Sequence, residues 1–118
     1  GCGGIGAVLE HKRMGLIDNW LRHVGDVATR HRTVLDDALP FETRHDRLCE
    51  LNAIEQAMNV CGTNIVQDAW ARGQKVVRLG WCYSLEDGLI RDLGMSSRSR
   101  EEADAGFARA CERMRAEV

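Results

Sequence analysis

The fold class of this chain depends on the stretch KVVRLGWCYSLEDGLIRDL, residues 75–93. In residues 75–83 two sets of side chains alternate, one with Val77, Leu79, Trp81 and Tyr83 and the other with Val76, Arg78, Gly80 and Cys82. A period of two places neighbouring side chains on opposite faces of a strand. Glu86-Asp87-Gly88 predicts a turn, and residues 89–93 are short enough for a returning strand. The stretch therefore predicts a β-hairpin at residues 75–93.

The segments before the hairpin have the periodicity of helices. Apolar residues recur every three or four positions in residues 16–35, which predicts one long amphipathic helix. Thr43 and Asp46 have the spacing of a capping box, so a second helix is predicted to begin there and to end at Gly62.

Two more helices are predicted around the hairpin. Asn64 with Gln67 predicts the start of a third helix, which Gly73 should end. Ser99 with Glu102 forms another capping box, so the chain is predicted to finish in a helix. A two-stranded hairpin is marginally stable alone, so we expect it to need further strands from another segment or a partner.

The composition excludes several classes of protein. The 118 residues, 44% hydrophobic and 29% charged, are enough for a core and for one domain at most. A net charge of −2 is too balanced for general nucleic-acid binding. No apolar run approaches the roughly 20 residues that cross a bilayer. We therefore expect a cytoplasmic protein without nucleic-acid or membrane partners, although a chain that begins at Gly1 leaves another compartment open.

The five cysteines are an odd number and do not indicate a disulfide framework. Cys49, Cys61 and Cys111 lie among helix-periodic apolar residues, where a reduced cysteine behaves as a small hydrophobe. Trp70 and Trp81 are likewise expected in the core.

The first six residues, Gly1-Cys2-Gly3-Gly4-Ile5-Gly6, match the dinucleotide-binding pattern GxGxxG. That fingerprint requires a preceding strand and a ribose-binding acid, and nothing here precedes the glycines. A narrower interpretation is favoured: a glycine turn before a helix, in which the helix N-terminus favours the thiolate of Cys2.

These residues also carry a resemblance to a known family. Residues 1–8 (GCGGIGAV) and 15–23 (GLIDNWLRH) resemble the β-class carbonic anhydrases of bacteria and plants. The resemblance continues in LNAIEQ at 51–56, AWARGQ at 69–74 and GWCYSLEDGL at 80–89, in order and at family spacing. It implies an α/β fold, here the helix-rich C-terminal part of a mainly parallel sheet flanked by helices.

The resemblance also implies a zinc site and an activity. Cys2 matches the cysteine ligand of the family's His-x-x-Cys-Gly-Gly motif, and Gly3 and Gly4 match the glycines whose backbone shapes the substrate pocket. The ligand histidine, a second cysteine ligand and an Asp-Arg dyad would lie upstream of Gly1. Residues 1–118 are therefore expected to be the C-terminal portion of a single domain. The complete enzyme would be a lyase that hydrates CO₂ to bicarbonate, whereas this chain alone is expected to be inactive and to hold no catalytic residue.

Two further expectations follow from the resemblance. Tyr83 matches the tyrosine that helps some family members to hold a non-catalytic bicarbonate, although a strand tyrosine can equally be a packing residue. The complete protein is expected to be a homodimer or a higher homo-oligomer.

Alternatives remain for the metal and for the function. His45 and Cys49, four residues apart, share one side of a helix, but structural zinc normally needs four convergent ligands. His11 and His23 are expected on an exposed face or in a loop, and His31 as a partly buried imidazole. The alternative function is a non-catalytic association module that docks on another chain.

Overall fold

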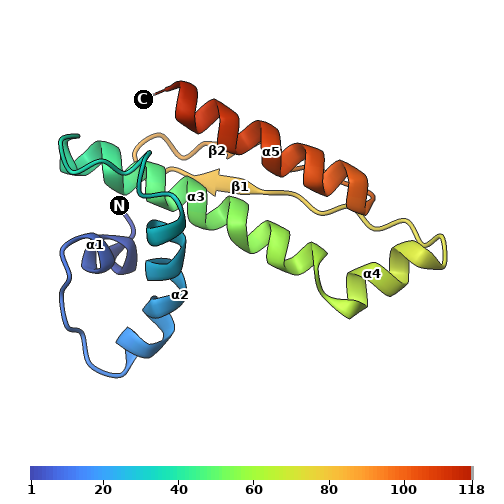
Figure 1. Ribbon diagram of the computed structural model, residues 1–118, viewed down its shortest axis with the longest axis horizontal. Helices are drawn as coiled ribbons and strands as arrows, with labels where there is room; N and C mark the ends of the chain where they lie inside the picture. Colours follow the sequence, from blue (N-terminus) through green and yellow to red (C-terminus); the bar gives the residue numbers. More distant parts are fainter. Residues whose placement is uncertain (118) are drawn as a thin grey trace. The chain divides into compact units, whose positions relative to one another are not determined.

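The computed structural model describes residues 1–117, and Figure 1 traces its elements. In chain order they are α1 (Gly3–Leu9), α2 (Ile17–Arg30), α3 (Phe41–Cys61), α4 (Asn64–Ala71), β1 (Trp81–Tyr83), β2 (Ile90–Asp92) and α5 (Arg100–Ala116). The chain divides into two compact units, Gly1–Asn52 and Ala53–Val118, and α3 contributes to both. Within residues 1–117 no helix combines the length and apolar character that spanning a bilayer requires.

The first unit is built on α2, whose inward face buries Leu21, Val24 and Val27. The predicted helix at residues 16–35 is correct in its body and wrong at its end. After Arg30 the backbone bonds shorten to a three-residue spacing, from Val34 N–H to the His31 carbonyl and from Leu35 N–H to the Arg32 carbonyl. Arg47 also donates to the Val34 carbonyl at 3.0 Å, which holds this segment as a turn.

The helix α3 begins earlier than the capping box at Thr43 and Asp46 predicts. Its first residue is Phe41, directly after Pro40, and the Pro40 carbonyl accepts from the Arg44 N–H at 3.1 Å. Thr43 therefore lies within the first turn and is not the cap. The predicted end at Gly62 is confirmed, since α3 ends at Cys61.

The second unit begins with the end of α3 and continues through the short helix α4. The hydroxyl of Thr63, not the side chain of Asn64, caps this helix by accepting from the Val66 N–H. Gly73 follows the helix with a φ of +77°, as its predicted role as a stop requires.

The predicted hairpin is present but short. β1 and β2 pair antiparallel, with Trp81 opposite Asp92 and Tyr83 opposite Ile90. Arg78 forms a separate bridge with Ser97, so the rest of residues 75–83 is extended without being a continuous strand. Within residues 1–117 the structure has this one sheet of two strands. The larger, mainly parallel sheet remains an expectation.

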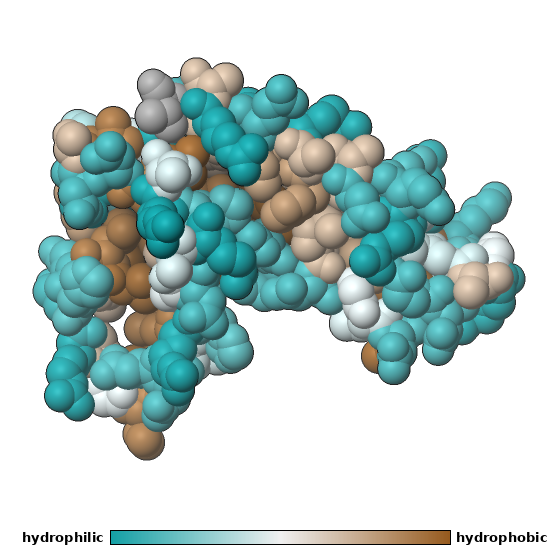
Figure 2. Space-filling model, in the orientation of Figure 1, coloured by the Kyte–Doolittle hydropathy of each residue, from teal (hydrophilic) through white to brown (hydrophobic). Residues whose placement is uncertain are grey.

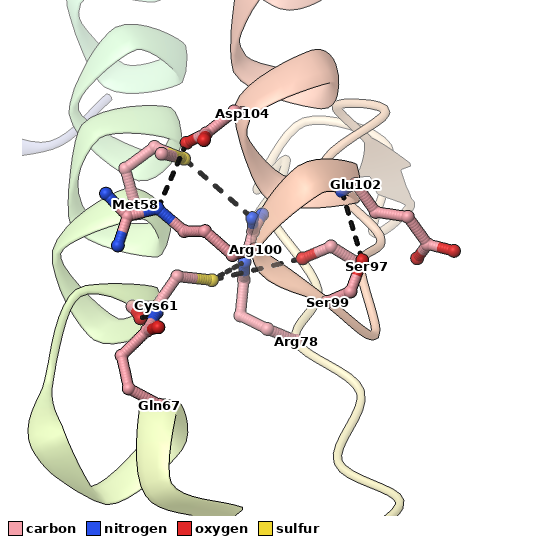
Figure 3. Close-up of polar contacts among 9 residues, drawn as sticks. All are labelled: Met58, Cys61, Gln67, Arg78, Ser97, Ser99, Arg100, Glu102 and Asp104. Carbon is pink, nitrogen blue, oxygen red and sulfur yellow. Dashed lines mark hydrogen bonds and ion pairs between the residues drawn. The ribbon is translucent and has the colours of Figure 1, made fainter. Parts of the chain in front are cut away.

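Arg78 crosses the interior of the second unit and joins three segments (Figure 3). The residue is 7% exposed, and its guanidinium donates to Cys61 Sγ at 3.0 Å and to the Met95 carbonyl. Met58 Sδ lies 4.0 Å from the same group, and the Cys61 thiol also meets Ser97 Oγ at 3.9 Å. The end of α3 is thereby tied to the extended segment and to the residues that follow β2.

Close packing surrounds the extended segment, which Figure 1 shows running between the end of α3 and α5. A β carbon at Gly80 would stand 2.7 Å from Met95 Cβ and 3.7 Å from Ala57 Cβ. On the α5 side, a β carbon at Gly106 would lie 3.4 Å from the Gly94 carbonyl oxygen. The predicted cap of α5 is confirmed, because Ser99 Oγ accepts from the Glu102 N–H at 3.2 Å.

Several large apolar side chains are exposed in both units. Brown surface at the lower left of Figure 2 lies over the loop between α1 and α2, where Leu16 is 89% exposed. In the hairpin Trp81 is 51% exposed, so the expectation of Trp81 in the core is wrong for residues 1–117. Side chains alternate along this extended segment, and the face with Arg78 and Gly80 points inward. Trp81 therefore lies on the outward face.

Candidate metal-binding site

Cys2 is the N-cap residue of α1. Its backbone is extended, with φ of −74° and ψ of 119°, and its side chain makes no capping hydrogen bond. The residue is exposed, so its sulfur remains available to a ligand. The predicted glycine turn is shorter than expected, because the helix already begins at Gly3.

The two glycines after Cys2 differ in their surroundings. A β carbon at Gly4 would meet Leu21 Cδ2 at 3.0 Å, so this glycine allows α1 to approach α2 closely. A β carbon at Gly3 would meet nothing within 4 Å. Packing therefore accounts for Gly4 but not for Gly3, and the role of both in a substrate pocket stays a prediction.

Two side chains of α3 lie beside Cys2 in the first unit. His45 is 8% exposed, and its Nε2 lies 2.8 Å from the Cys2 carbonyl oxygen. Its Nδ1 lies 3.8 Å from the Sγ of Cys49. Burial, the largest cause, raises the pKa of the Cys49 thiol, while a hydrogen bond with the Cys2 backbone opposes this shift in part. Cys49 is therefore a half-buried thiol whose burial favours the protonated form, whereas Cys2 is exposed.

The donor set for zinc is incomplete within the described chain. Among residues 1–117 no group of three or more His, Cys, Asp or Glu side chains is arranged to hold a metal ion. His45 and Cys49 meet as their spacing predicts, but no third ligand joins them. Cys2 fits zinc as a single soft thiolate donor, because its sulfur is exposed and uncommitted. Other donors must complete such a site.

The remaining histidines lie elsewhere. His11 and His23 are exposed, as expected, and His11 lies in the loop after α1 with a φ of +52°. His31 is half-buried at the C-cap of α2, in agreement with the expectation of a partly buried imidazole.

The first unit also contains an open cleft that sequence reasoning did not predict. It has a volume of about 730 Å³ and is bordered by charged residues of both signs, including Arg22, Arg32, Arg44, Asp26 and Asp36. Cys2 is not among its lining residues, so this cleft is separate from the candidate metal site. Its mixed charge indicates no particular ligand.

Tyr83 lies in the second unit, on β1, and is 63% exposed. A β carbon at Gly88 would stand 3.8 Å from its phenolic oxygen, so the ring lies over the hairpin turn. Its role at a non-catalytic bicarbonate site stays a prediction.

Comparisons with known proteins agree with this α/β architecture. The family model described as carbonic anhydrase matches residues 1–90. A curated carbonic anhydrase of Emericella nidulans is 36% identical over 94 residues, which is 80% of this chain and 41% of that protein. The solved structure of the Coccomyxa β-carbonic anhydrase in complex with acetazolamide is similar with a TM-score of 0.82 and 32% identity. The chain therefore belongs to the carbonic anhydrase family, in its β class.

The similarity extends over most of this chain but only part of its relatives. The match to the Coccomyxa structure covers 94% of this chain and 52% of the other. The chain thus spans about half the length of that structure, and 41% of the curated relative.

Proposed function

We propose that this chain is part of a zinc-dependent β-carbonic anhydrase that interconverts CO₂ and bicarbonate, with Cys2 as one zinc ligand. Membership of the family supports the reaction. The observation that carries the site is the exposed Cys2 sulfur at the start of α1, which caps no helix and forms no disulfide. The other ligands and the groups that act on the substrate come from residues outside these 118.

The chemistry of this proposal divides between the metal and the chain. Bound zinc supplies Lewis acidity, which makes a water molecule acidic enough to lose a proton near neutral pH. The chain's own part is to present the Cys2 sulfur from a fixed backbone. Gly4 contributes to this by letting α1 lie against Leu21 of α2.

The test compares two cysteine variants of the whole protein to which these residues belong. Cys2→Ser should lose zinc and CO₂ hydration together, because a neutral hydroxyl is a much poorer zinc ligand than a thiolate. Cys82→Ser, in the hairpin, is the matched control and should keep both. Metal analysis and stopped-flow hydration of the purified proteins give the answer.

Two results would contradict the proposal. Full zinc occupancy in Cys2→Ser would remove Cys2 from the site. An intact, folded protein with neither zinc nor turnover would favour the association module. The exposed Trp81 and Leu85 of the hairpin region are the residues that such a module would offer to another chain.

A further inference from the structure

The contact between His45 and Cys2 joins residues 43 positions apart in the first unit. The imidazole Nε2 lies 2.8 Å from the Cys2 carbonyl oxygen. A carbonyl oxygen can only accept, so Nε2 must carry a hydrogen and donate it. This requirement fixes the proton position on the ring, which sequence and spacing leave open.

The His45 ring is held in place by its surroundings. The ring of Phe41, one turn earlier on α3, has its centroid 5.9 Å away at an interplanar angle of 48°. On another side, a β carbon at Gly6 would stand 3.7 Å from His45 Cδ2, so the α1 backbone lies against the ring. Nδ1 faces Cys49 Sγ at 3.8 Å and Asp46 Oδ1 at 3.9 Å. The imidazole is therefore a fixed donor and not a mobile surface group.

The accepting carbonyl is also the first hydrogen-bond acceptor of α1. The Gly6 N–H donates to the Cys2 carbonyl at 3.1 Å, and His45 adds a second bond to the same oxygen. Two donors from different directions fix the plane of the peptide that follows Cys2. Since the side chain of Cys2 makes no capping bond, this anchor acts on the backbone from which the sulfur extends.

We propose that His45 is a positioning residue for the metal ligand Cys2, and that its Nε2–H orients the Cys2 backbone so that the sulfur is presented to the metal. This inference rests on the proposed function, in which Cys2 binds zinc. His45 does not touch the metal, and it acts through the Cys2 carbonyl. Groups that orient metal ligands in this way are commonly worth a factor of about 10 or more in metal affinity.

The test measures zinc affinity in the whole protein by competition with a chelator. His45→Phe keeps a ring of similar size but has no donor, and it should weaken zinc binding by about 10-fold. His45→Gln can return an N–H to the carbonyl and should recover part of the loss. His23→Phe, at an exposed position on α2, is the matched control and should bind zinc like the unaltered protein.

A second measurement does not depend on any variant. Long-range ¹H–¹⁵N spectra of the histidines should show His45 protonated at Nε2, with or without zinc.

Absorption of the cobalt-substituted protein adds a geometric readout, because the sulfur-to-cobalt band should shift in His45→Phe and return toward its position in His45→Gln. A purely structural role would lower stability in both variants without this recovery.

The outcomes separate the two proposals. If Cys2→Ser loses zinc while His45→Phe binds it with unchanged affinity, the role of His45 is wrong and the proposed function stands. If Cys2→Ser keeps its zinc, the proposed function is wrong. If His45→Phe does not fold, the spectra decide, and a ring protonated only at Nδ1 overturns the inference.

Discussion

The Nε–H of Arg78 donates to the Sγ of Cys61 at 3.0 Å inside the second unit. Among residues 1–117 no carboxylate pairs with this buried guanidinium, whose other contacts are the Met95 carbonyl and the sulfur of Met58. A charge this well enclosed is normally compensated by an anion. Here the Cys61 thiol and the Met95 carbonyl take the place of an anion. Arg78 and Cys61 should therefore depend on each other for their contribution to stability.

A double-mutant cycle measures that dependence. Arg78→Met and Cys61→Ala should each lower the stability of the protein, because each leaves a buried polar group without its partner, at a cost of about 1–3 kcal/mol. Their combination should cost less than the sum, with a coupling of about 0.5–3 kcal/mol. Chemical denaturation gives the values. Arg109→Met, at an exposed position of α5, is the control, and strictly additive losses would show that the contact is unimportant.

The cap of α5 offers a test of local stability. Ser99→Ala removes the oxygen that accepts from the Glu102 N–H at 3.2 Å, and should cost about 1 kcal/mol. Ser96→Ala, three residues earlier and exposed, should change stability little. Thermal melts of both variants provide the comparison. Equal melting temperatures would mean that the cap contributes nothing measurable.

The turn of the hairpin should respond to acid. The Arg91 guanidinium, followed by the Leu89 N–H, lowers the pKa of Asp87 below its ordinary 3.8. A lowered pKa in the folded state means that the carboxylate stabilises the turn above about pH 3.8 and that this contribution is lost as pH falls through the lowered pKa. The Leu89 amide signal in NMR should therefore titrate with a midpoint below 3.8.

A substitution separates charge from hydrogen bonding in this turn. Asp87→Asn keeps an oxygen for the Leu89 N–H, which is 3.0 Å away, but loses the charge that faces Arg91. The titration of the Leu89 amide should disappear in this variant. Persistence of the same transition would assign it to another group.

The isolated 118 residues should show no CO₂ hydration above the buffer rate, even with added zinc. The reason is that Cys2 is the one zinc ligand assigned in this chain, and a metal bound by a single protein ligand is not retained. The whole protein should be active under the same conditions. Stopped-flow measurements on both samples check this, and robust turnover by the 118 residues would mean that the site has been placed wrongly.

Exposed apolar residues predict association. Leu16 of the first unit is 89% exposed, and Tyr83 and Leu85 of the second are 63% and 80% exposed. Contiguous apolar surface usually marks an interface. We expect the whole protein to be at least a dimer, and the isolated 118 residues to aggregate or to be partly unfolded. Light scattering with circular dichroism can show this; a monodisperse, cooperatively melting 118-residue monomer would favour a self-contained module.

Local signals in the sequence predicted local structure well. The Ser99 cap, the stop at Gly73 and the turn before β2 all depend on contacts within a few residues, and each is present. The start of α3 was predicted wrongly because Pro40 and the capping box at Thr43 compete. Both are valid start signals, and nothing in the local pattern ranks them.

Contacts between distant residues could not be predicted in this way. Strand length depends on a pairing partner, so residues 75–83 were predicted as one strand although only Trp81–Tyr83 forms a continuous ladder and Arg78 a separate bridge. The family motif made Cys2 a candidate zinc ligand, but the contact of Cys2 with His45 spans 43 positions and has no periodic signature. The i, i+4 spacing of His45 and Cys49 predicted their contact, because both residues lie on one helix.

The close approach of Gly80 to Met95 has a consequence for how this family can diverge. A β carbon at position 80 would stand 2.7 Å from Met95 Cβ, and any residue other than glycine at position 95 has that same atom. As long as position 80 stays glycine, side chains of different kinds can therefore follow the β carbon at position 95. A lineage that replaces Gly80 must therefore either place glycine at position 95 or move one of the two backbones. Relatives with this backbone should therefore inherit the two positions as a linked pair.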